Sequence, residues 1–405
     1  MTPARLIGLL VALSVVAAAC GTASEGGGSS DDDLASTTTG AGGSVPAAGP
    51  LPEGPSALDD RSNASFPEPL VDLNDIVSGG PPPDGIPPID DPKFVTVTEA
   101  DAWLNDAEPV LVVDVDGDVR AYPIQILMWH EIVNDTVGGV PLAVTYCPLC
   151  NSAVSFERTV RGVETTFGTS GSLYFANLVM YDRATESLWN QIDGRAVVGV
   201  LTGDVLAQIP SNMVAWSDFK AARPDAQVLD RNRTGASRNY GTNPYTGLDD
   251  PNGQPFLFRG DVDVRAKAMQ RIVALELDGD AAAWTEDAIS ADTGAAVTED
   301  DIAGQPLVIF WKEGQASALE SSDIAGGREV GTVGVFIPVV DGQTLTFRAD
   351  GSSFIDDQTS SIWDVLGEAV SGPLAGSALE PVTFVRTFWF SWSTFRPDTE
   401  LIEGQ

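Results

Sequence analysis

The chain has 405 residues and a formal net charge of −36, because 58 acidic residues stand against 22 Lys and Arg. Nucleic-acid binding needs clustered Lys and Arg, so this charge excludes nucleic acid as a partner and argues against direct docking on anionic lipid. An acidic surface keeps a protein soluble, and we prefer this interpretation to a role in gathering cations.

The chain begins with a sequence typical of a secreted bacterial lipoprotein. Arg5 precedes an apolar run at 6–19, and small residues lead up to Cys20 and Gly21. This order is that of a secretory signal, and the residues before Cys20 resemble a bacterial lipobox. The resemblance implies cleavage of residues 1–19 and attachment of diacylglycerol to the Cys20 sulfur. The alternative is an ordinary cleaved signal that leaves a free cysteine. We therefore expect an extracytoplasmic protein that its N-terminal lipid anchors to the cell membrane.

Residues 20–65 are rich in Gly, Ser, Thr, Pro and Asp and contain few large apolar side chains. Such a composition cannot bury enough apolar surface to offset the entropy lost on ordering. We therefore predict that residues 20–65 form a disordered tether. No later segment approaches the roughly 20 apolar residues that a membrane-spanning helix needs.

The rest of the chain contains pairs of similar segments in the same order. Residues 108–123 and 270–285 both show alternating apolar residues, then Asp-Gly-Asp, then Ala and an aromatic residue. Three further pairs follow: 138–158 with 302–322, 181–206 with 355–379, and 214–229 with 386–401. We interpret them as an internal duplication that produced a first lobe at 90–245 and a second lobe at 262–403. The second lobe has no Cys and no His.

Several segments have the period of β-strands. Alternation of apolar residues predicts strands at 110–115 and 272–277, each followed by an Asp-Gly turn. The segments "PLAVTY" and "SAVSFERT" predict two strands around the loop of Cys147 and Cys150. We therefore expect an α+β fold, mainly antiparallel β with short helices, in which two similar tandem lobes pack as a pseudo-dimer.

Two segments have the signals of short helices. Pro123 suits a first helical turn, and the apolar residues that follow it at spacings of three and four extend to Val133. Ser211 and Asn212 are candidate caps of another helix, which we expect to end before Pro224.

The Cys-Pro-Leu-Cys segment resembles the metal-binding knuckle of rubredoxins and zinc ribbons. Asn151 follows Cys150, where Asn is the best substitute for a left-handed Gly. The chain has no second knuckle, so His130, its only histidine, is the candidate third ligand beside Cys147 and Cys150. A site with two Cys and one His leaves one position open, and such ligands suit zinc or copper. Candidates for the fourth ligand are Met128, Glu131, Met180 and Asp182.

Two other interpretations of Cys147 and Cys150 stay open. In a redox pair, the Cys-x-x-Cys motif lowers a thiol pKa when it begins a helix, but here a strand is predicted to follow. A disulfide across so few residues is strained and therefore easily reduced. In the third interpretation the pair is a structural disulfide, which forms readily outside the cytoplasm but stabilises little by closing so small a loop. For His130, the plain alternative is an imidazole at the edge of the core.

The segment 167–189 mixes Gly, Ser, Tyr, Asn, Asp and Arg densely. Together with two residues of the loop that follows the first lobe, it supplies the candidate lining of a polar ligand pocket: Ser170, Tyr174, Asn177, Met180, Asp182, Arg183, Arg238 and Tyr245. The alternative is an ordinary turn with core aromatics. The chain has no Gly-rich phosphate loop, no HExxH helix and no nucleophile elbow.

Residues 121–158, 167–189 and 234–248 resemble the domain-of-unknown-function family 3179 of bacteria and archaea. The resemblance implies that the Trp-His-Glu, Cys-Pro-Leu-Cys and Met-Tyr-Asp-Arg segments form the hallmark of the family, and it implies no established activity. Asn151 departs from the Gly expected in many members, which puts the knuckle in doubt. We expect a membrane-tethered protein with a metal- or thiol-dependent site in the first lobe. The alternative is a lipoprotein that binds a small molecule or a protein, with Cys147 and Cys150 joined only as a structural disulfide.

Overall fold

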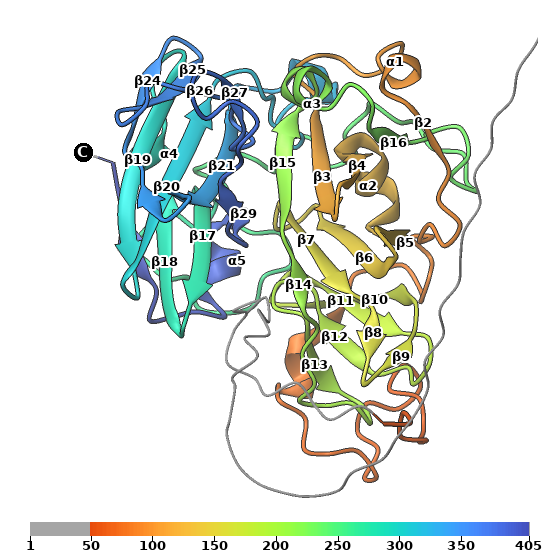
Figure 1. Ribbon diagram of the computed structural model, residues 1–405. Coiled ribbons are helices and arrows are strands. Elements are labelled where there is room, and N and C mark those ends of the chain that lie inside the picture. Colours follow the sequence, from red (N-terminus) through yellow and green to blue (C-terminus); the bar gives the residue numbers. More distant parts are fainter. Residues whose placement is uncertain (1–48, 405) are drawn as a thin grey trace, which may run out of the picture. The chain divides into compact units, whose positions relative to one another are not determined.

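The computed structural model describes residues 49–404, which form a mainly antiparallel β fold with short helices, as predicted (Figure 1). The predictions for the signal at 1–19, for lipidation of Cys20 and for the tether up to residue 48 lie outside the described residues. Within residues 49–404, no helix combines the length and the apolar character that crossing a membrane requires.

The segment 49–65, which we expected to be a disordered part of the tether, packs on the first lobe. Ala57 is fully buried, and its N–H donates to the carbonyl of Glu186. The N–H of Gly49 donates to the carbonyl of Arg161. Composition alone misses this packing, because the first lobe supplies the apolar surface that the segment itself lacks.

Three sheets and a hairpin form the first lobe. One sheet has the strand order β15-β3-β4-β16-β2, from Ser211–Ala215 (β15), Pro109–Val115 (β3), Asp118–Pro123 (β4), Gln227–Leu229 (β16) and Phe94–Thr96 (β2). The next has the order β14-β7-β6-β5, from Gln208–Ile209 (β14), Ser152–Glu157 (β7), Val140–Cys147 (β6) and Ile132–Val137 (β5). The third has the order β1-β10-β11-β12-β13, from Ile76–Ser78 (β1), Phe167–Tyr174 (β10), Asn177–Asp182 (β11), Leu188–Asn190 (β12) and Arg195–Val198 (β13). The hairpin joins Thr159–Val160 (β8) to Val163–Glu164 (β9).

The second lobe also has three sheets and a hairpin. One has the order β29-β17-β18-β30, from Val385–Phe388 (β29), Arg271–Leu277 (β17), Asp280–Thr285 (β18) and Glu400–Ile402 (β30). The next has the order β19-β20-β21-β28, from Ala295–Ile302 (β19), Gln305–Lys312 (β20), Thr332–Ile337 (β21) and Glu380–Pro381 (β28). The third has the order β24-β25-β26-β27, from Phe347–Asp350 (β24), Ser353–Asp356 (β25), Ile362–Trp363 (β26) and Ala369–Ser371 (β27). The hairpin joins Val339–Val340 (β22) to Gln343–Thr344 (β23).

The strand order of the first lobe thus recurs in the second, which Figure 1 draws in cyan to blue. The order β15-β3-β4-β16 corresponds to β29-β17-β18-β30, and in both sets the last pair is parallel while the others are antiparallel. The order β14-β7-β6-β5 corresponds to β28-β21-β20-β19. The third sheets correspond as well, and each has a register shift beside its Trp, at Trp189 and Trp363.

Among residues 49–404 the helices are short, and the two longest, α2 and α3, have seven residues each. They are α1 (Val97–Ala100), α2 (Ile124–His130), α3 (Trp216–Ala222), α4 (Glu286–Ile289) and α5 (Trp389–Ser393), with 3-10 turns η1 (Leu73–Asp75) and η2 (Ile324–Gly326). Short helices gain little from backbone propensity alone, so contacts with the sheets hold them in place.

The structure confirms the predicted strands on both sides of the Cys loop and corrects both predicted helices. α2 begins after Pro123 as expected but ends at His130, because Glu131 has a left-handed φ of 58° and β5 follows. The helix expected from Ser211 begins only at Trp216. The residues before Trp216 form β15 instead, which pairs along its length with β3. Pairing with a buried strand outweighs the local cap signals of Ser and Asn.

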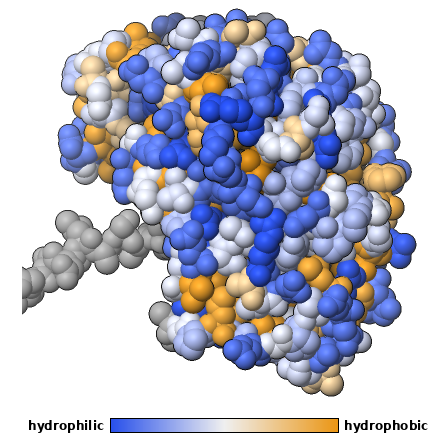
Figure 2. Space-filling view, turned by 90° about the vertical axis from the view of Figure 1, so that its right-hand side faces the viewer, coloured by the Kyte–Doolittle hydropathy of each residue, from blue (hydrophilic) through white to orange (hydrophobic). Residues whose placement is uncertain are grey.

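The view in Figure 2 shows a face on which hydrophilic residues predominate and hydrophobic residues form small, separate groups.

Candidate functional site

The two cysteines lie in the turn between β6 and β7. Cys147 is the last residue of β6 and pairs with Ser152, the first residue of β7. The Cys150 N–H donates to the Cys147 carbonyl over 3.2 Å. Asn151 has a φ of 54°, which confirms the left-handed conformation predicted for it. A strand follows the turn, so the Cys-Pro-Leu-Cys segment does not begin a helix.

Both thiols are free and buried, and their sulfur atoms are closer than van der Waals contact. The exposed fractions of Cys147 and Cys150 are 1% and 0%, and their Sγ atoms are 2.9 Å apart. A disulfide bond measures about 2.05 Å, so a bond would need the sulfurs to approach by about 0.9 Å. The turn therefore holds the pair close to the geometry of a disulfide.

Polar groups surround Cys150 inside this buried site. Its S–H donates to Asn177 Oδ1 over 3.0 Å, and the Ser391 hydroxyl donates to the same oxygen over 2.7 Å. Burial raises the pKa of the Cys150 thiol, and the hydrogen bond and charge of Cys147 raise it further. The hydroxyls of Ser391 and Ser152 oppose this shift without cancelling it. In the closed structure, Cys150 is therefore a protonated thiol at neutral pH.

The second lobe covers this turn. The Thr387 hydroxyl donates to the Cys150 carbonyl over 2.8 Å, and the Phe388 N–H donates to the same carbonyl over 3.2 Å. Thr387 and Phe388 belong to β29, and Ser391 belongs to the helix that follows it. The first lobe supplies the thiols, and the second lobe supplies the Thr387 and Ser391 hydroxyls and the backbone that close over them.

His130 does not join the thiols as a metal ligand. Its Nδ1 lies 2.7 Å from the Pro87 carbonyl, which can only accept, so Nδ1 carries the proton. Its Nε2 lies 2.7 Å from the Tyr240 hydroxyl and accepts from it. Burial lowers the pKa of His130, and nearby Arg238 lowers it further, which keeps the ring neutral. Both ring nitrogens are therefore engaged by the protein.

The predicted zinc or copper site of His130, Cys147 and Cys150 is accordingly not assembled. Among residues 49–404 no group of three or more His, Cys, Asp or Glu side chains is placed to hold a metal ion. Met180, a candidate fourth ligand, is fully buried in the same apolar cluster as both cysteines. The sequence did not indicate the partners of His130, because Pro87 and Tyr240 lie 43 and 110 residues away from it in the chain.

The residue after His130 was considered only as a fourth metal ligand, yet its surroundings are unusual. Glu131 is buried, and burial raises its pKa to about 8. The phenol pKa of half-buried Tyr245 is raised by burial first and then by the charges of Glu131 and Cys147. Tyr245 therefore lies close enough to sense both the thiol pair and a carboxyl that titrates near neutral pH. In the sequence, Glu131 is distinguished only by its position directly after His130.

The predicted pocket residues of the segment 167–189 do not act as one set. Asn177 contacts Cys150, as described above. The Ser170 hydroxyl donates to the Val179 carbonyl at the bulge between β10 and β11. The Tyr174 ring packs against the Phe175 ring, with the centroids 4.5 Å apart and the planes tilted by 46°. These contacts position Asn177 and leave Ser170 and Tyr174 as structural residues.

The charged members of the predicted pocket serve local structure. Asp182 accepts from Thr185 and Ser187 in a tight turn and from the Trp189 indole over 3.0 Å. Arg183 forms ion pairs with two acidic residues outside the predicted set, Asp84 and Asp90. Arg238 is exposed.

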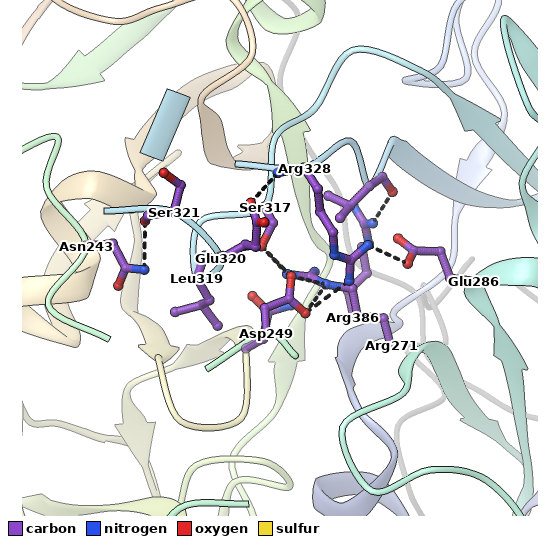
Figure 3. Close-up of polar contacts among 12 residues, drawn as sticks. Asn243, Asp249, Arg271, Glu286, Ser317, Leu319, Glu320, Ser321, Arg328 and Arg386 are labelled. Carbon is purple, nitrogen blue, oxygen red and sulfur yellow. Dashed lines mark hydrogen bonds and ion pairs between the residues drawn. The ribbon is translucent and has the colours of Figure 1, made fainter. Parts of the chain in front are cut away.

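A buried ionic cluster lies beside the thiol turn, and Figure 3 shows its members converging on Asp249. The Asp249 carboxylate accepts from Arg271 over 2.9 Å and from Arg328 over 3.2 Å, and the Ser317 hydroxyl also donates to it. Arg328 reaches Glu286 as well, at 3.5 Å. Sequence reasoning missed this cluster, because Asp249 lies between the lobes and its partners follow only in the second.

A small cavity joins this cluster to the thiol turn. Its lining includes Asn151, Thr387, Arg271, Glu286 and Arg386, and its volume is about 10 Å³. Such a volume suits about one water molecule. The Asn151 amide nitrogen and one Glu286 oxygen lie there buried without a protein partner. Burial and then the charge of Arg271 lower the pKa of Arg386 to about 10. The cavity thus has both polar and apolar walls, lies between Asn151 of the thiol turn and the ionic cluster, and is too small for an organic substrate.

Comparison with known proteins places the whole of this arrangement in one family. The model of a family described as "Protein of unknown function (DUF3179)" matches residues 83–399. This range contains the thiol turn, Glu131, the ionic cluster and the covering strand β29. No curated protein and no solved structure matches the chain.

Proposed function

We propose that this chain, which belongs to the DUF3179 family, is an extracytoplasmic dithiol protein whose Cys147 and Cys150 exchange with a disulfide. In the exchange, one thiolate attacks a disulfide of a partner, and the second thiolate then displaces the partner sulfur. Cys147 and Cys150 lose two electrons and two protons and become bonded, while the partner disulfide becomes two thiols. The observation that carries the proposal is the pair of free sulfurs 2.9 Å apart in a constrained turn.

The surroundings of the pair support a regulated exchange. A thiolate is the attacking species, and burial raises the pKa of Cys150. Reaction therefore requires β29 and α5 to move away from the turn, which would hydrate the thiols and lower the pKa of Cys150. The pKa of Glu131 is raised to about 8, and its charge and that of Cys147 both act on Tyr245, so the protonation state of this carboxyl affects the surroundings of the pair.

We further propose that the two lobes arose by internal duplication and that the second became the cover of the first. The recurring strand order and the paired parallel contacts β4–β16 and β18–β30 support this proposal. In this view the second lobe lost the cysteines because its own turn took up another contact.

We also propose that lipidation of Cys20 holds the protein at the outer side of the cell membrane. The support is the signal-like sequence at 1–19 and the residues around Cys20. Mass spectrometry of the protein purified from its native membrane tests this: we expect a diacylglyceryl group on Cys20, and an unmodified Cys20 would contradict it.

The thiol proposal is tested by a redox titration. The protein is equilibrated with mixtures of reduced and oxidised glutathione, and with dithiothreitol and its oxidised form for the lowest potentials, and the free thiols are counted after alkylation by mass spectrometry. We expect a reversible two-electron transition between roughly −150 and −280 mV, the range of exchanging dithiols. Cys147→Ser and Cys150→Ser should each abolish it, whereas His130→Ala should leave it in place.

The same titration separates the alternatives. A midpoint below about −300 mV would indicate a structural disulfide and would favour the alternative of a binding lipoprotein. Stoichiometric metal in the reduced protein, lost in both Cys→Ser variants, would overturn the exchange proposal in favour of a metal site.

A further inference from the structure

A second, larger cavity is lined in part by Tyr240, the hydrogen-bond partner of His130, and the thiol proposal does not use this cavity. It has a volume of about 400 Å³, which is within the range of small-molecule sites. Its main lining residues are Trp103, Glu108, Gln125, Arg231, Tyr240 and Asp323. Tyr240 is held in place by its hydrogen bonds to His130 and to Thr234, at 2.7 and 2.6 Å.

The floor of this cavity contains an acceptor that nothing in the protein satisfies. Gln125 is 1% exposed, and its Nε2 donates to Glu108 Oε2 over 2.6 Å. That bond fixes the orientation of the amide and leaves Gln125 Oε1 buried with no hydrogen-bond partner. A buried unpaired carbonyl costs about 1–3 kcal/mol. The cavity therefore favours an occupant that donates a hydrogen bond.

The charge of the cavity favours a cation. Glu108 is 3% exposed, and its second oxygen accepts from the Asn105 backbone and side chain. Burial raises the pKa of Glu108, and the charge of Asp323 at the same cavity raises it further. The two carboxylates therefore repel each other, and a positive charge between them would relieve that repulsion.

Aromatic rings and one arginine complete the walls. The Arg231 guanidinium lies over the Trp103 ring, 4.8 Å from its centroid, and is occupied by that contact. Burial raises the pKa of the Tyr240 phenol, and the charge of the exposed Arg238, which does not line the cavity, opposes this shift. The charged lining residues are Arg231, Glu108 and Asp323. Aromatic faces attract cations and cover apolar carbon chains.

We propose that this cavity binds a small primary amine, with the ammonium group donating to Gln125 Oε1 beside Glu108 and the carbon chain against Trp103 and Tyr240. A carboxylate or phosphate ligand would meet two carboxylates and an unpaired acceptor. The amine supplies both the donor and the charge that the cavity lacks.

Isothermal titration calorimetry of the full chain tests the proposal with 1,4-diaminobutane and butylamine as probes. Butanol and butyrate are the neutral and anionic controls of the same length. We expect the amines to bind and the controls to bind at least about tenfold more weakly, since a hydrogen bond to a charged group stabilises by about 1.5–3 kcal/mol. Glu108→Gln should weaken amine binding at least about tenfold by the same reasoning.

A variant at the exposed Asp323 keeps the test decisive if Glu108→Gln fails to fold. Asp323→Asn should weaken amine binding about two- to fivefold, and added salt should reduce that difference. Asp301→Asn removes the same charge from an exposed position that does not line this cavity, and it should leave binding unchanged. Absence of amine binding, equal binding of butanol, or equal effects of Asp323→Asn and Asp301→Asn would overturn the proposal. The redox titration of Cys147 and Cys150 is independent of all these outcomes.

Discussion

Each lobe packs the end of one strand pair against a short helix of the other lobe, and the side chains at these two equivalent contacts differ. In the first lobe, Cys147 pairs with Ser152 at the end of β6, and in the second lobe Lys312 pairs with Thr332 at the end of β20. Each pair contacts a short helix of the other lobe, α5 after β29 or α3 after β15. The third residue of that helix makes the contact. Ser391 of α5 lies at the thiols, whereas Asp218 of α3 forms an ion pair with Lys312.

The comparison shows what the fold needs from this position. Thr332 donates its hydroxyl to Asp218 over 2.9 Å and accepts from the Ala215 N–H over 3.0 Å. A charged pair and hydroxyls thus hold the second contact without sulfur. Since the same architecture is stable with Lys312 and Asp218, the thiols of the first contact are not required for folding, which favours a chemical role for them.

The largest loss of stability is expected at the buried ionic cluster around Asp249, whose partners belong to the second lobe. Asp249→Ala leaves the guanidinium groups of Arg271 and Arg328 without their shared carboxylate. Loss of one partner of a buried pair costs about 3–5 kcal/mol. Urea denaturation should show this loss in the free energy of unfolding. The neighbouring exposed Asp250→Ala is the control, and an equal effect in both variants would contradict the prediction.

The next effect concerns the first lobe alone and depends on pH. The pKa of Glu131 is raised to about 8 in the folded state, above its usual value of 4.5. The folded state therefore binds the proton more tightly, and stability falls as pH rises from about 4.5 to about 8. Glu131→Gln should stabilise the protein by about 3 kcal/mol at pH 7 and by nothing below pH 4.5.

Thermal unfolding between pH 4 and pH 9 measures this difference. The exposed Glu313→Gln in the second lobe is the control and should not change the pH profile. A difference in unfolding temperature between wild type and Glu131→Gln that stays constant across that pH range would rule out the titration assigned to Glu131.

A smaller effect should distinguish the two equivalent contacts. Asp218→Ala removes hydrogen bonds to Lys312 and Thr332, one of them to a charged group, and should cost about 2–3 kcal/mol. Ser391→Ala removes one neutral hydrogen bond to Asn177 and should cost about 1 kcal/mol. If urea denaturation gave equal losses in the free energy of unfolding for Asp218→Ala and Ser391→Ala, the two contacts would contribute equally to stability despite their different side chains.

The smallest effect should be equal in both lobes. Thr185 bonds to Asp182 just as Thr359 bonds to Asp356, through N–H and hydroxyl, and each Asp also accepts from a Trp indole over 3.0 Å. Thr185→Val and Thr359→Val each remove one hydroxyl donor and should each cost about 1 kcal/mol. A difference above about 1 kcal/mol between the variants would break the equivalence of the two turns.

Some of this structure was predictable because it depends on local residues. Alternating apolar residues identified β3 and β17, and an Asn after the second cysteine implied the left-handed turn found at Asn151. Cap signals at Ser211 and Asn212 misled us, because they compete with pairing to a strand about 100 residues earlier in the chain. Local sequence does not report such distant partners.

The candidate site was less predictable, since its parts come from both lobes. The proximity of Cys147 to Cys150 follows from their spacing, and Asn177 was among the residues expected near them. The cover by Thr387 and Ser391 depends on the packing of a strand that the Cys motif does not encode. His130 was misplaced because Tyr240, its partner, is 110 residues away.

The order of the chain gives the cover of Cys150 a temporal consequence. Thr387 follows Cys150 by 237 residues, so at about 5–20 residues per second the ribosome adds it roughly 10–50 s later. During that interval the second lobe does not yet cover the turn, and only first-lobe residues such as Ala176 and Asn177 are available to contact the Cys150 sulfur. Any oxidase or reductase that meets the growing polypeptide therefore acts on an open pair, and closure of the last strands then preserves whichever state it left.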